Sequence, residues 1–412
     1  MRYLTLLLLA CSLKSFSLEK TNCLDAADLF TFSREPLNKQ VHAEDNFLFS
    51  VEINKLLITG LKNFYDNKFE TGYRSFEEAL RMMRGNYGLY SSTQIKALAP
   101  MIKQTLIQKD FLRFYKYQNI FNNLILRSED VHPIQKIKYS INSALSYLSL
   151  AFYDESTAPY QNLLRADETL GNILDQETIS LCPKISAEAL WLRSAINFAI
   201  EQHFLLWKGE PIFGIAEEKI YTDRRANPID KLSRKNSMLN FRINGESYLE
   251  EAIDVLKKKN ADNLLKIALR IKGDWHLLHG NNEKFMEYVN QSKNIGIKQP
   301  ENLYKFSYFE LLNQFQSKSV KFYTKCRVSV QRNGKIKSSR VLESTDGSKK
   351  IDKLVCRRLK SVVFRPDAYT SEPINFIIGF DGEKNKNNFD RPIFTWGIIK
   401  SEQNTRPIWA GR

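Results

Sequence analysis

Two histidines have a spacing that could serve metal chemistry. His276 and His279 are three residues apart, so on a helix they would share one face and could both bind a metal ion. Only Asp274 and Glu283 lie at offsets that could add a carboxylate ligand. However, His279 also lies near a predicted helix C-terminus, where the partial negative charge favours histidine without any metal. We therefore expect no metal site and no cofactor.

Motifs of the common catalytic classes are absent from the sequence. It contains no GxSxG, HExxH, P-loop or GxGxxG pattern. The carboxylate pairs Glu77-Glu78 and Glu217-Glu218 are adjacent in sequence, so on a helix they do not share a face and are typical of solvated surface. These observations predict a protein that is not an enzyme.

The N-terminus has the pattern of a secretory signal peptide over residues 1–17. Arg2 precedes an apolar run from Tyr3 to Leu13, and Ser17 supplies a small residue for cleavage. An alternative is lipidation at Cys11, which follows Leu8-Leu9-Ala10, and a third is an uncleaved cytoplasmic chain. The first interpretation predicts a periplasmic protein, and the second a lipoprotein anchored through Cys11.

Composition indicates a globular chain. Of 412 residues, 43% are hydrophobic and 26% are charged, which argues against global disorder. The length suggests two or three domains. No apolar stretch long enough to span a bilayer follows the N-terminus, so we expect no transmembrane helix after signal cleavage.

Residues 24–315 are predicted to be helical, because apolar residues recur at spacings of three and four. Within them, Gly60 is followed by Gly72, Phe76 and Ala79 at 12, 16 and 19 residues. This spacing resembles the tetratricopeptide repeat, in which small residues let two antiparallel helices approach closely. The alternative is an ordinary helical bundle.

A second, degenerate copy of this repeat begins at Gly273 and includes Gly280, Phe285 and Ser292. Residues 207–245 lack a clear period and contain Pro211, Gly214 and Pro228, so we expect an irregular excursion there. The alternative is a repeat with a decorated loop.

The pattern changes near residue 320. Phe322, Cys326, Val328 and Val330 alternate with polar residues, Asn333-Gly334 is a strong hairpin signal, and a return strand follows from residue 336. Residues 349–362 are periodic as a helix, and 374–380 alternate as a third strand. We therefore predict a mainly α protein that ends in a small α+β (ββαβ) domain over residues 320–382, with an extension over 383–412.

This ending resembles the C-terminal domain of TonB-type proteins. The matching features are the following residues: Gly334, Ser344, Ile351, Leu359 and Phe364-Arg365-Pro366. Residues 88–106 and the segment Gly273–Gly280 also look like the helical part of periplasmic tetratricopeptide proteins that carry this ending. The resemblance implies a domain that docks a partner, with a component of a TonB-type transport system as the alternative.

Four cysteines remain after signal cleavage, and an even number in an exported chain permits disulfides. Cys326 lies on the inward face of the first strand and Cys356 on the helix that should cover it, so we expect a Cys326–Cys356 bridge ahead of Cys23–Cys182. Buried free thiols are the alternative.

Positive charge is concentrated at the C-terminal end. Residues 318–412 contain 21 Lys and Arg against 9 Asp and Glu, a net charge of +12. The expected basic patch comprises Lys335, Lys337, Arg340, Arg357 and Arg358. Such a field attracts an acidic protein partner, peptidoglycan or an anionic lipid surface, and nucleic acid is not expected after export. A lysine-rich surface without a dedicated partner is the alternative.

The third predicted strand carries no charge, and an uncharged edge strand can accept an extended peptide. Its residues are Ile374, Asn375, Phe376, Ile377, Ile378, Gly379 and Phe380. Equally, residues 387–409 contain enough apolar side chains to fold back and cover this edge. Taken together, the sequence predicts a non-enzymatic periplasmic scaffold that binds a protein or peptide partner in the cell envelope.

Overall fold

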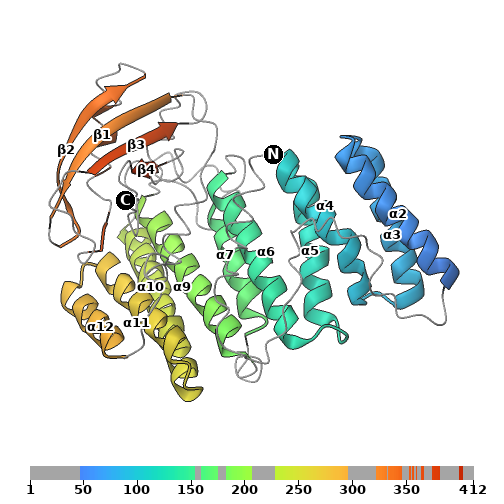
Figure 1. Cartoon of the computed structure of the whole chain (residues 1–412), viewed down its shortest axis with the longest axis horizontal. Helices are drawn as coiled ribbons and strands as arrows, with labels where there is room; N and C mark the ends of the chain where they lie inside the picture. The colour runs from blue at the N-terminus through green and yellow to red at the C-terminus, as the bar shows by residue number, and fades with distance from the viewer. Residues whose placement is uncertain are drawn as a thin grey trace. The chain divides into compact units, whose positions relative to one another are not determined.

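The structure is a computed structural model in which the chain forms two compact units (Figure 1). It describes residues 47–153, 159–174, 182–206, 228–295, 322–331, 333–345, 352–353, 355–356, 359, 363–365, 374–380 and 399–401. One unit is Met1–Ser143 with Thr169–Cys182, and the other is Ala144–Glu168 with Pro183–Arg412. The described residues are mainly helical, with a small antiparallel sheet near the C-terminus.

The first unit is built from paired helices. Its elements are α2 (Phe47–Tyr65), α3 (Phe69–Tyr87), the short 3-10 helix η2 (Ser92–Gln94), α4 (Ile95–Gln108), α5 (Phe111–Arg127) and the start of α6 (Pro133–Tyr153). Helices α4 and α5 are separate because Lys109 adopts a left-handed conformation and the Asp110 side chain caps α5. The result is a series of short-looped helical hairpins.

Close packing joins α2 to α3. A Cβ atom on Gly60 would lie 2.7 Å from the Phe76 ring, and one on Gly72 would lie 2.4 Å from the Phe64 ring. Phe76 and Ala79 are fully buried between the helices. The small residues therefore allow the aromatic rings to fill the space where the two helices meet.

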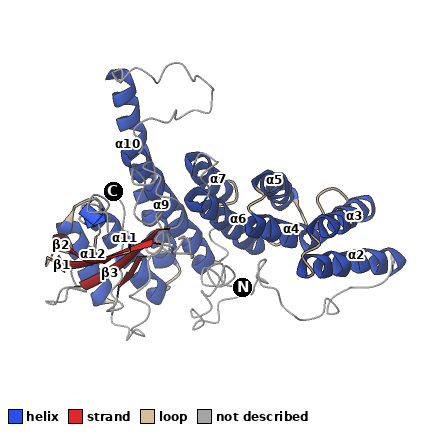
Figure 2. Ribbon diagram, turned by 90° about the horizontal axis from the view of Figure 1, so that it is seen from above, coloured by secondary structure: helices blue, strands red, loops and turns tan. Residues whose placement is uncertain are grey.

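The second unit contains four well-described helices beyond α7 (Pro159–Gly171). They are α9 (Pro183–Leu206), α10 (Pro228–Lys258), α11 (Asp262–Leu278) and α12 (Asn282–Asn294). The long helix α10 packs along α9, and α11 packs against α12 (Figure 1, Figure 2). Residues Leu265–Leu278 of α11 are buried without interruption, which makes α11 the most enclosed of these helices.

The expected irregular excursion at residues 207–245 needs correction over 228–245. These residues form the first half of α10, and 207–227 lie outside the described part of the chain. Pro228 suits the first position of a helix, and no other proline follows it within α10. The first half of α10 carries no regular apolar stripe, so hydrophobic periodicity alone could not reveal it.

The packing spacing of α3 recurs in the second unit. Gly72, Phe76 and Ala79 correspond in spacing to Gly245, Leu249 and Ala252 of α10, all of them buried. The same spacing in α12 falls on buried Phe285, Val289 and Ser292. A Cβ atom on Gly245 would lie 2.3 Å from the Trp275 ring of α11, so this glycine also permits a close helix contact.

The sheet consists of β1 (Phe322–Val330), β2 (Ile336–Ser344), β3 (Ile374–Phe380) and β4 (Ile399–Ser401), in the order β2-β1-β3-β4. All neighbouring strands are antiparallel. The buried face of β1 meets helical residues at 355–356 and 359. The sheet belongs to the same compact unit as α9–α12.

The β1–β2 turn requires a glycine at position 334. Its φ is +79°, and a Cβ atom there would lie 1.8 Å from the Phe364 carbonyl oxygen. Phe364 N donates a hydrogen bond to Gly334 O. The turn and the Phe364-Arg365 segment thus lock together through their backbones.

Candidate functional site

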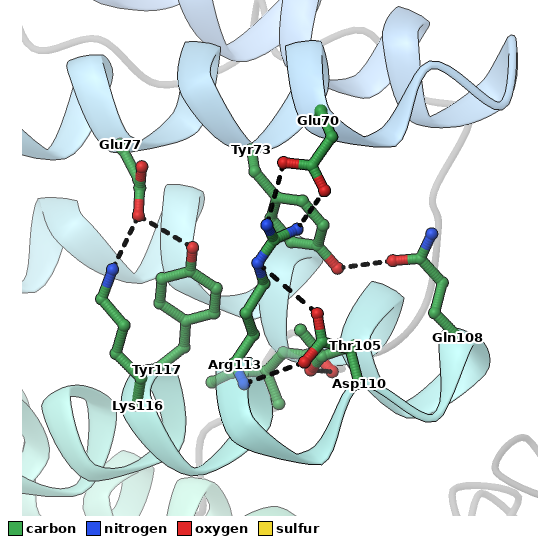
Figure 3. A network of polar contacts seen from close by, with 10 residues as sticks. Glu70, Tyr73, Glu77, Thr105, Gln108, Asp110, Arg113, Lys116 and Tyr117 are labelled. Carbon is green, nitrogen blue, oxygen red and sulfur yellow. Dashed lines mark hydrogen bonds and ion pairs between the residues drawn. The ribbon is translucent and has the colours of Figure 1, made fainter.

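A polar network joins the first two hairpins of the chain (Figure 3). Arg113 of α5 donates two parallel hydrogen bonds to the Glu70 carboxylate of α3, at 2.7 and 2.8 Å. Asp110 lies on the other side of the same guanidinium, with Oδ2 3.4 Å from Arg113 Nε. Arg113 is therefore held between carboxylates from two hairpins.

A second set of contacts lies one to two turns further along α3. Glu77 accepts hydrogen bonds from Lys116 and Tyr117 of α5, both at 2.9 Å. Tyr73 donates to Gln108 at 2.9 Å, and its ring stacks on that of Tyr117 with centroids 6.0 Å apart. The network thus combines ion pairs on the surface with buried aromatic rings beneath them.

The contacts within this network shift the pKa values of its carboxylates and phenols. The hydrogen bond from Arg113 lowers the pKa of Glu70. Burial acts to raise the pKa of Glu77, but hydrogen bonds from Lys116 and Tyr117 outweigh it and the pKa is lowered. Burial, as the largest cause, raises the pKa of Tyr73 and of Tyr117. At neutral pH the carboxylates are therefore ionised and the phenols protonated, which suits the ion pairs and hydrogen bonds between them.

The sheet β1–β4, together with the described residues between its strands, is called the C-terminal module below. A buried ion pair ties this module to α11. Arg365 donates to both carboxylate oxygens of Asp274, at 3.0 and 2.7 Å. The Asp274 side chain is fully buried and that of Arg365 is 9% exposed. Because an unpaired charge at such a site is very costly, this pair fixes where the Phe364-Arg365 segment contacts the helices.

Lys272 of α11 and His279, which follows α11, pair with carboxylates of α10 and α9. Lys272, with a side chain 3% exposed, lies 2.5 Å from Glu250 of α10. His279 Nε2 lies 2.7 Å from Glu201 Oε2, and its Nδ1 lies 2.7 Å from the Trp275 carbonyl oxygen. Both nitrogens of His279 are thus engaged by the protein.

His276 has a different environment. Its ring stacks on Tyr288, and its buried Nε2 makes no hydrogen bond, with Glu246 Oε1 3.6 Å away. Burial lowers the pKa of His276 to about 4, and nearby Lys284 and Lys272 add to the effect. The two histidines therefore have separate partners, and the described residues contain no group of three or more potential metal ligands.

The two cysteines predicted to form a disulfide lie close together but are not bonded, so the alternative of buried free thiols is the one found. Cys326 Sγ lies 3.0 Å from Cys356 Sγ, and both are buried, free thiols. Hydrogen bonding to Cys356, reinforced by burial, raises the pKa of Cys326, whereas the same hydrogen bond lowers that of Cys356. Ser339 donates to the Cys356 carbonyl oxygen at 2.9 Å, which helps to hold the helical residues over the sheet.

Cys182 takes part in a disulfide. The predicted partner, Cys23, lies outside the described residues, as do the signal peptide and Cys11.

The uncharged strand predicted to receive a peptide is not an open edge along its whole length. β3 pairs with β1 on one side, and on the other Phe376, Ile377 and Ile378 pair with residues of β4. This corrects the prediction of a free edge over Ile374–Phe380. Of the two outcomes left open by the sequence, coverage by a later segment is the one found at these three residues, which pair with Ile399–Ser401.

The predicted basic patch is exposed where it is described. Lys335, Lys337 and Arg340 are exposed along β2, the terminal strand of the sheet on that side. Arg357 and Arg358 lie outside the described residues.

Sequence reasoning missed the contact between Asp274 and Arg365 and the hairpin network. Arg365 had been noted only as part of a motif, and Asp274 only as a weak metal-ligand candidate. Asp274 and Arg365 are 91 residues apart, so no local pattern links them. A useful signal was nevertheless present, since a charged residue inside the continuous apolar period of α11 must find a partner.

No family model matches this chain, and no curated protein matches it in sequence. No helix among the described residues combines the length and apolar character that crossing a membrane would require.

Proposed function

We propose that this protein is a non-enzymatic periplasmic scaffold that binds a partner in the cell envelope through its helical hairpins and its basic C-terminal module. The observation that carries this proposal is the recurrence of one packing pattern in α3, α10 and α12. Hairpins that stack by a repeated pattern form extended surfaces, and such surfaces serve binding far more often than catalysis.

The hairpin network supports the same function. Glu70–Arg113 and Glu77–Lys116 join successive hairpins while neutralising each other's charge. A scaffold needs hairpins held in a fixed relation, since a preorganised surface loses less entropy on binding.

The C-terminal module supports a likeness to the TonB-type domain. It has two strands joined at Asn333-Gly334, helical residues at 352–353, 355–356 and 359, and a third strand. The dependence of Gly334 on Phe364 gives the hairpin glycine and the Phe-Arg motif a common structural reason. This element order also favours a second candidate function, a component of a TonB-type transport system.

Export is supported by cysteine chemistry. The disulfide at Cys182 requires an oxidising compartment, and the periplasm is one. Osmotic-shock fractionation would test this: the scaffold should be released with periplasmic proteins, or stay with the outer envelope if it is lipidated. Recovery in the cytoplasm would contradict export. Retention in the inner membrane, with partner binding that depends on the membrane potential, would favour the transport system instead.

Partner binding is tested by crosslinking in cells followed by affinity capture of the chain. The wild-type chain should capture one envelope protein reproducibly, and Gly85→Ala should leave that yield unchanged. Gly85 suits as a control because a Cβ atom there would meet no atom within 4 Å. A Gly60→Ala/Gly72→Ala variant should lose the partner if the first hairpins contribute to binding. Failure of the wild-type chain to capture any envelope protein would contradict the scaffold function.

A further inference from the structure

The outer face of the β1–β2 hairpin consists of three cross-strand rows. Lys325 lies opposite Glu343, Arg327 opposite Arg340, and Ser329 opposite Ser338. The other face of β1 is buried at Cys326 and Val328, which places these alternate residues on the side away from the helical residues.

The middle row is electrostatically unusual. Like charges directly opposite each other on antiparallel strands are destabilising, yet Arg327 and Arg340 are both exposed in this arrangement. The preceding row pairs Lys325 with Glu343, and Tyr323 donates to Glu343 at 2.5 Å. Charge is therefore balanced in one row and left unbalanced in the next.

The unbalanced row lies beside hydrogen-bond donors that have no partner among the described residues. Within that part of the chain, Arg340, Ser329 and Ser338 make no side-chain hydrogen bond or ion pair. Arg327 Nε donates to Asn375 at 3.1 Å, which orients its side chain and leaves its terminal nitrogens available. Arg327, Arg340 and Ser338 are thus exposed on this face and Ser329 is half-buried there, with no carboxylate in these two rows.

We propose that this face, comprising Arg327, Ser329, Ser338 and Arg340, binds the phosphate groups of an anionic phospholipid surface. This inference rests on the proposed envelope function and specifies a surface that the C-terminal module contacts. A phosphate group presents several acceptor oxygens, which matches two forked guanidinium groups and two hydroxyls better than a single carboxylate does.

A membrane surface fits this face better than an acidic protein. The Arg327–Arg340 and Ser329–Ser338 rows contain no apolar side chain that could serve as a buried anchor, and the aromatic Tyr323 on the same face is held by its hydrogen bond to Glu343, whereas protein interfaces depend on such anchors. The charge of this segment also favours an anionic membrane surface, because residues 322–345 contain six Lys and Arg against one Glu. Clusters of this size near a bilayer are attracted to anionic lipid headgroups.

Sedimentation of the full chain with lipid vesicles tests the proposal. The vesicles are phosphatidylcholine alone, or phosphatidylcholine with about one-third phosphatidylglycerol. The wild-type chain should sediment only with the anionic vesicles and should be released as salt rises from about 50 to about 300 mM. Arg340→Gln and Arg327→Gln should each lower the partition coefficient about fivefold.

Lys353→Gln is the matched control. Lys353 is exposed on the helical segment that covers the opposite face of the sheet, so its loss removes one charge and leaves the proposed face intact. This control should lower partition less than about twofold. Arg340→Lys keeps the charge but loses the forked geometry, so it should fall between wild type and Arg340→Gln. Unchanged thermal unfolding would show that each variant is folded.

Three results would overturn the assignment. The first is no binding of the wild-type chain to anionic vesicles. The second is an equal loss with Lys353→Gln and Arg340→Gln, which would mean diffuse attraction without a site. The third is binding of inorganic phosphate or of an acidic protein at Arg340 while vesicles are ignored. None of these results would contradict the scaffold proposal if a partner were still captured through the hairpins. Failure of the lipid-binding proposal can therefore be told apart from failure of the scaffold proposal.

Discussion

Asp274 is fully buried, and its carboxylate forms an ion pair with Arg365. We predict that Asp274→Asn destabilises the second unit by about 3–5 kcal/mol, because it leaves the Arg365 charge buried without its counterion. Chemical denaturation followed by tryptophan fluorescence would measure this, since Trp275 is the next residue.

Glu287→Gln provides the comparison for Asp274→Asn. Glu287 is exposed on α12 of the same unit, and its replacement should change stability by less than about 0.5 kcal/mol. Similar losses in the two variants would mean that the Arg365 contact does not hold the module in place.

His276 predicts a dependence of stability on pH. Its folded-state pKa is lowered to about 4 from the ordinary value of 6.5. Between these values the unfolded chain binds a proton that the folded chain does not, so this histidine makes stability fall as pH decreases from 6.5 towards 4. The slope is at most about 1.4 kcal/mol per pH unit.

His276→Gln removes this titration and should flatten the stability profile between pH 4 and 6.5. Above pH 7 the wild type and the variant should have parallel profiles. The same steep fall in both chains would assign the acid sensitivity to other groups.

At the scale of elements, the α2–α3 contact depends on glycines, which have no side chain to clash with the neighbouring aromatic rings. Gly72→Ala would place a Cβ atom 2.4 Å from Phe64, so we predict destabilisation by about 1–3 kcal/mol. Gly85→Ala in the same helix meets nothing within 4 Å and should stabilise by about 0.5–1 kcal/mol. Thermal unfolding of the two variants measures the difference, and equal shifts would contradict this account of the packing.

The Cys326–Cys356 contact links β1 to the helical segment over it. With oxidised glutathione as oxidant, the two thiols should form one disulfide and lose two protons and two electrons, giving two reduced glutathione molecules. Closing this loop of about 30 residues should stabilise by about 3 kcal/mol. Mass spectrometry after thiol blocking reports the bond, and persistently blocked thiols in the folded chain would contradict the prediction.

The elements were largely predictable because their signals are local. Apolar periodicity predicted the helical region as a whole, and alternation with Asn333-Gly334 located β1 and β2. The first half of α10 escaped because its sequence has no apolar stripe, and β4 because three residues carry too little pattern. The Asp274–Arg365 and Glu70–Arg113 pairs were not predicted, because no local sequence pattern links residues that are far apart in the chain.

For the whole molecule, the contacts suggest that the two units have different roles. The first unit joins its hairpins through paired charges at α3 and α5, whereas the second unit encloses α11 and holds the small sheet through Arg365. The positive charge is concentrated in the last residues of the chain, where we infer contact with an anionic surface. Partner binding by hairpins and surface binding by the sheet would then be separable functions of one scaffold.

Site-specific photocrosslinking in cells tests the scaffold claim most directly. A photoreactive amino acid would replace Leu112 on α5, which is 84% exposed, or Lys337 on β2, which is also exposed. The account predicts a discrete, light-dependent adduct with one envelope protein from the hairpin position, in the fraction released by osmotic shock. A folded, exported chain that gives no protein adduct from either position would contradict it.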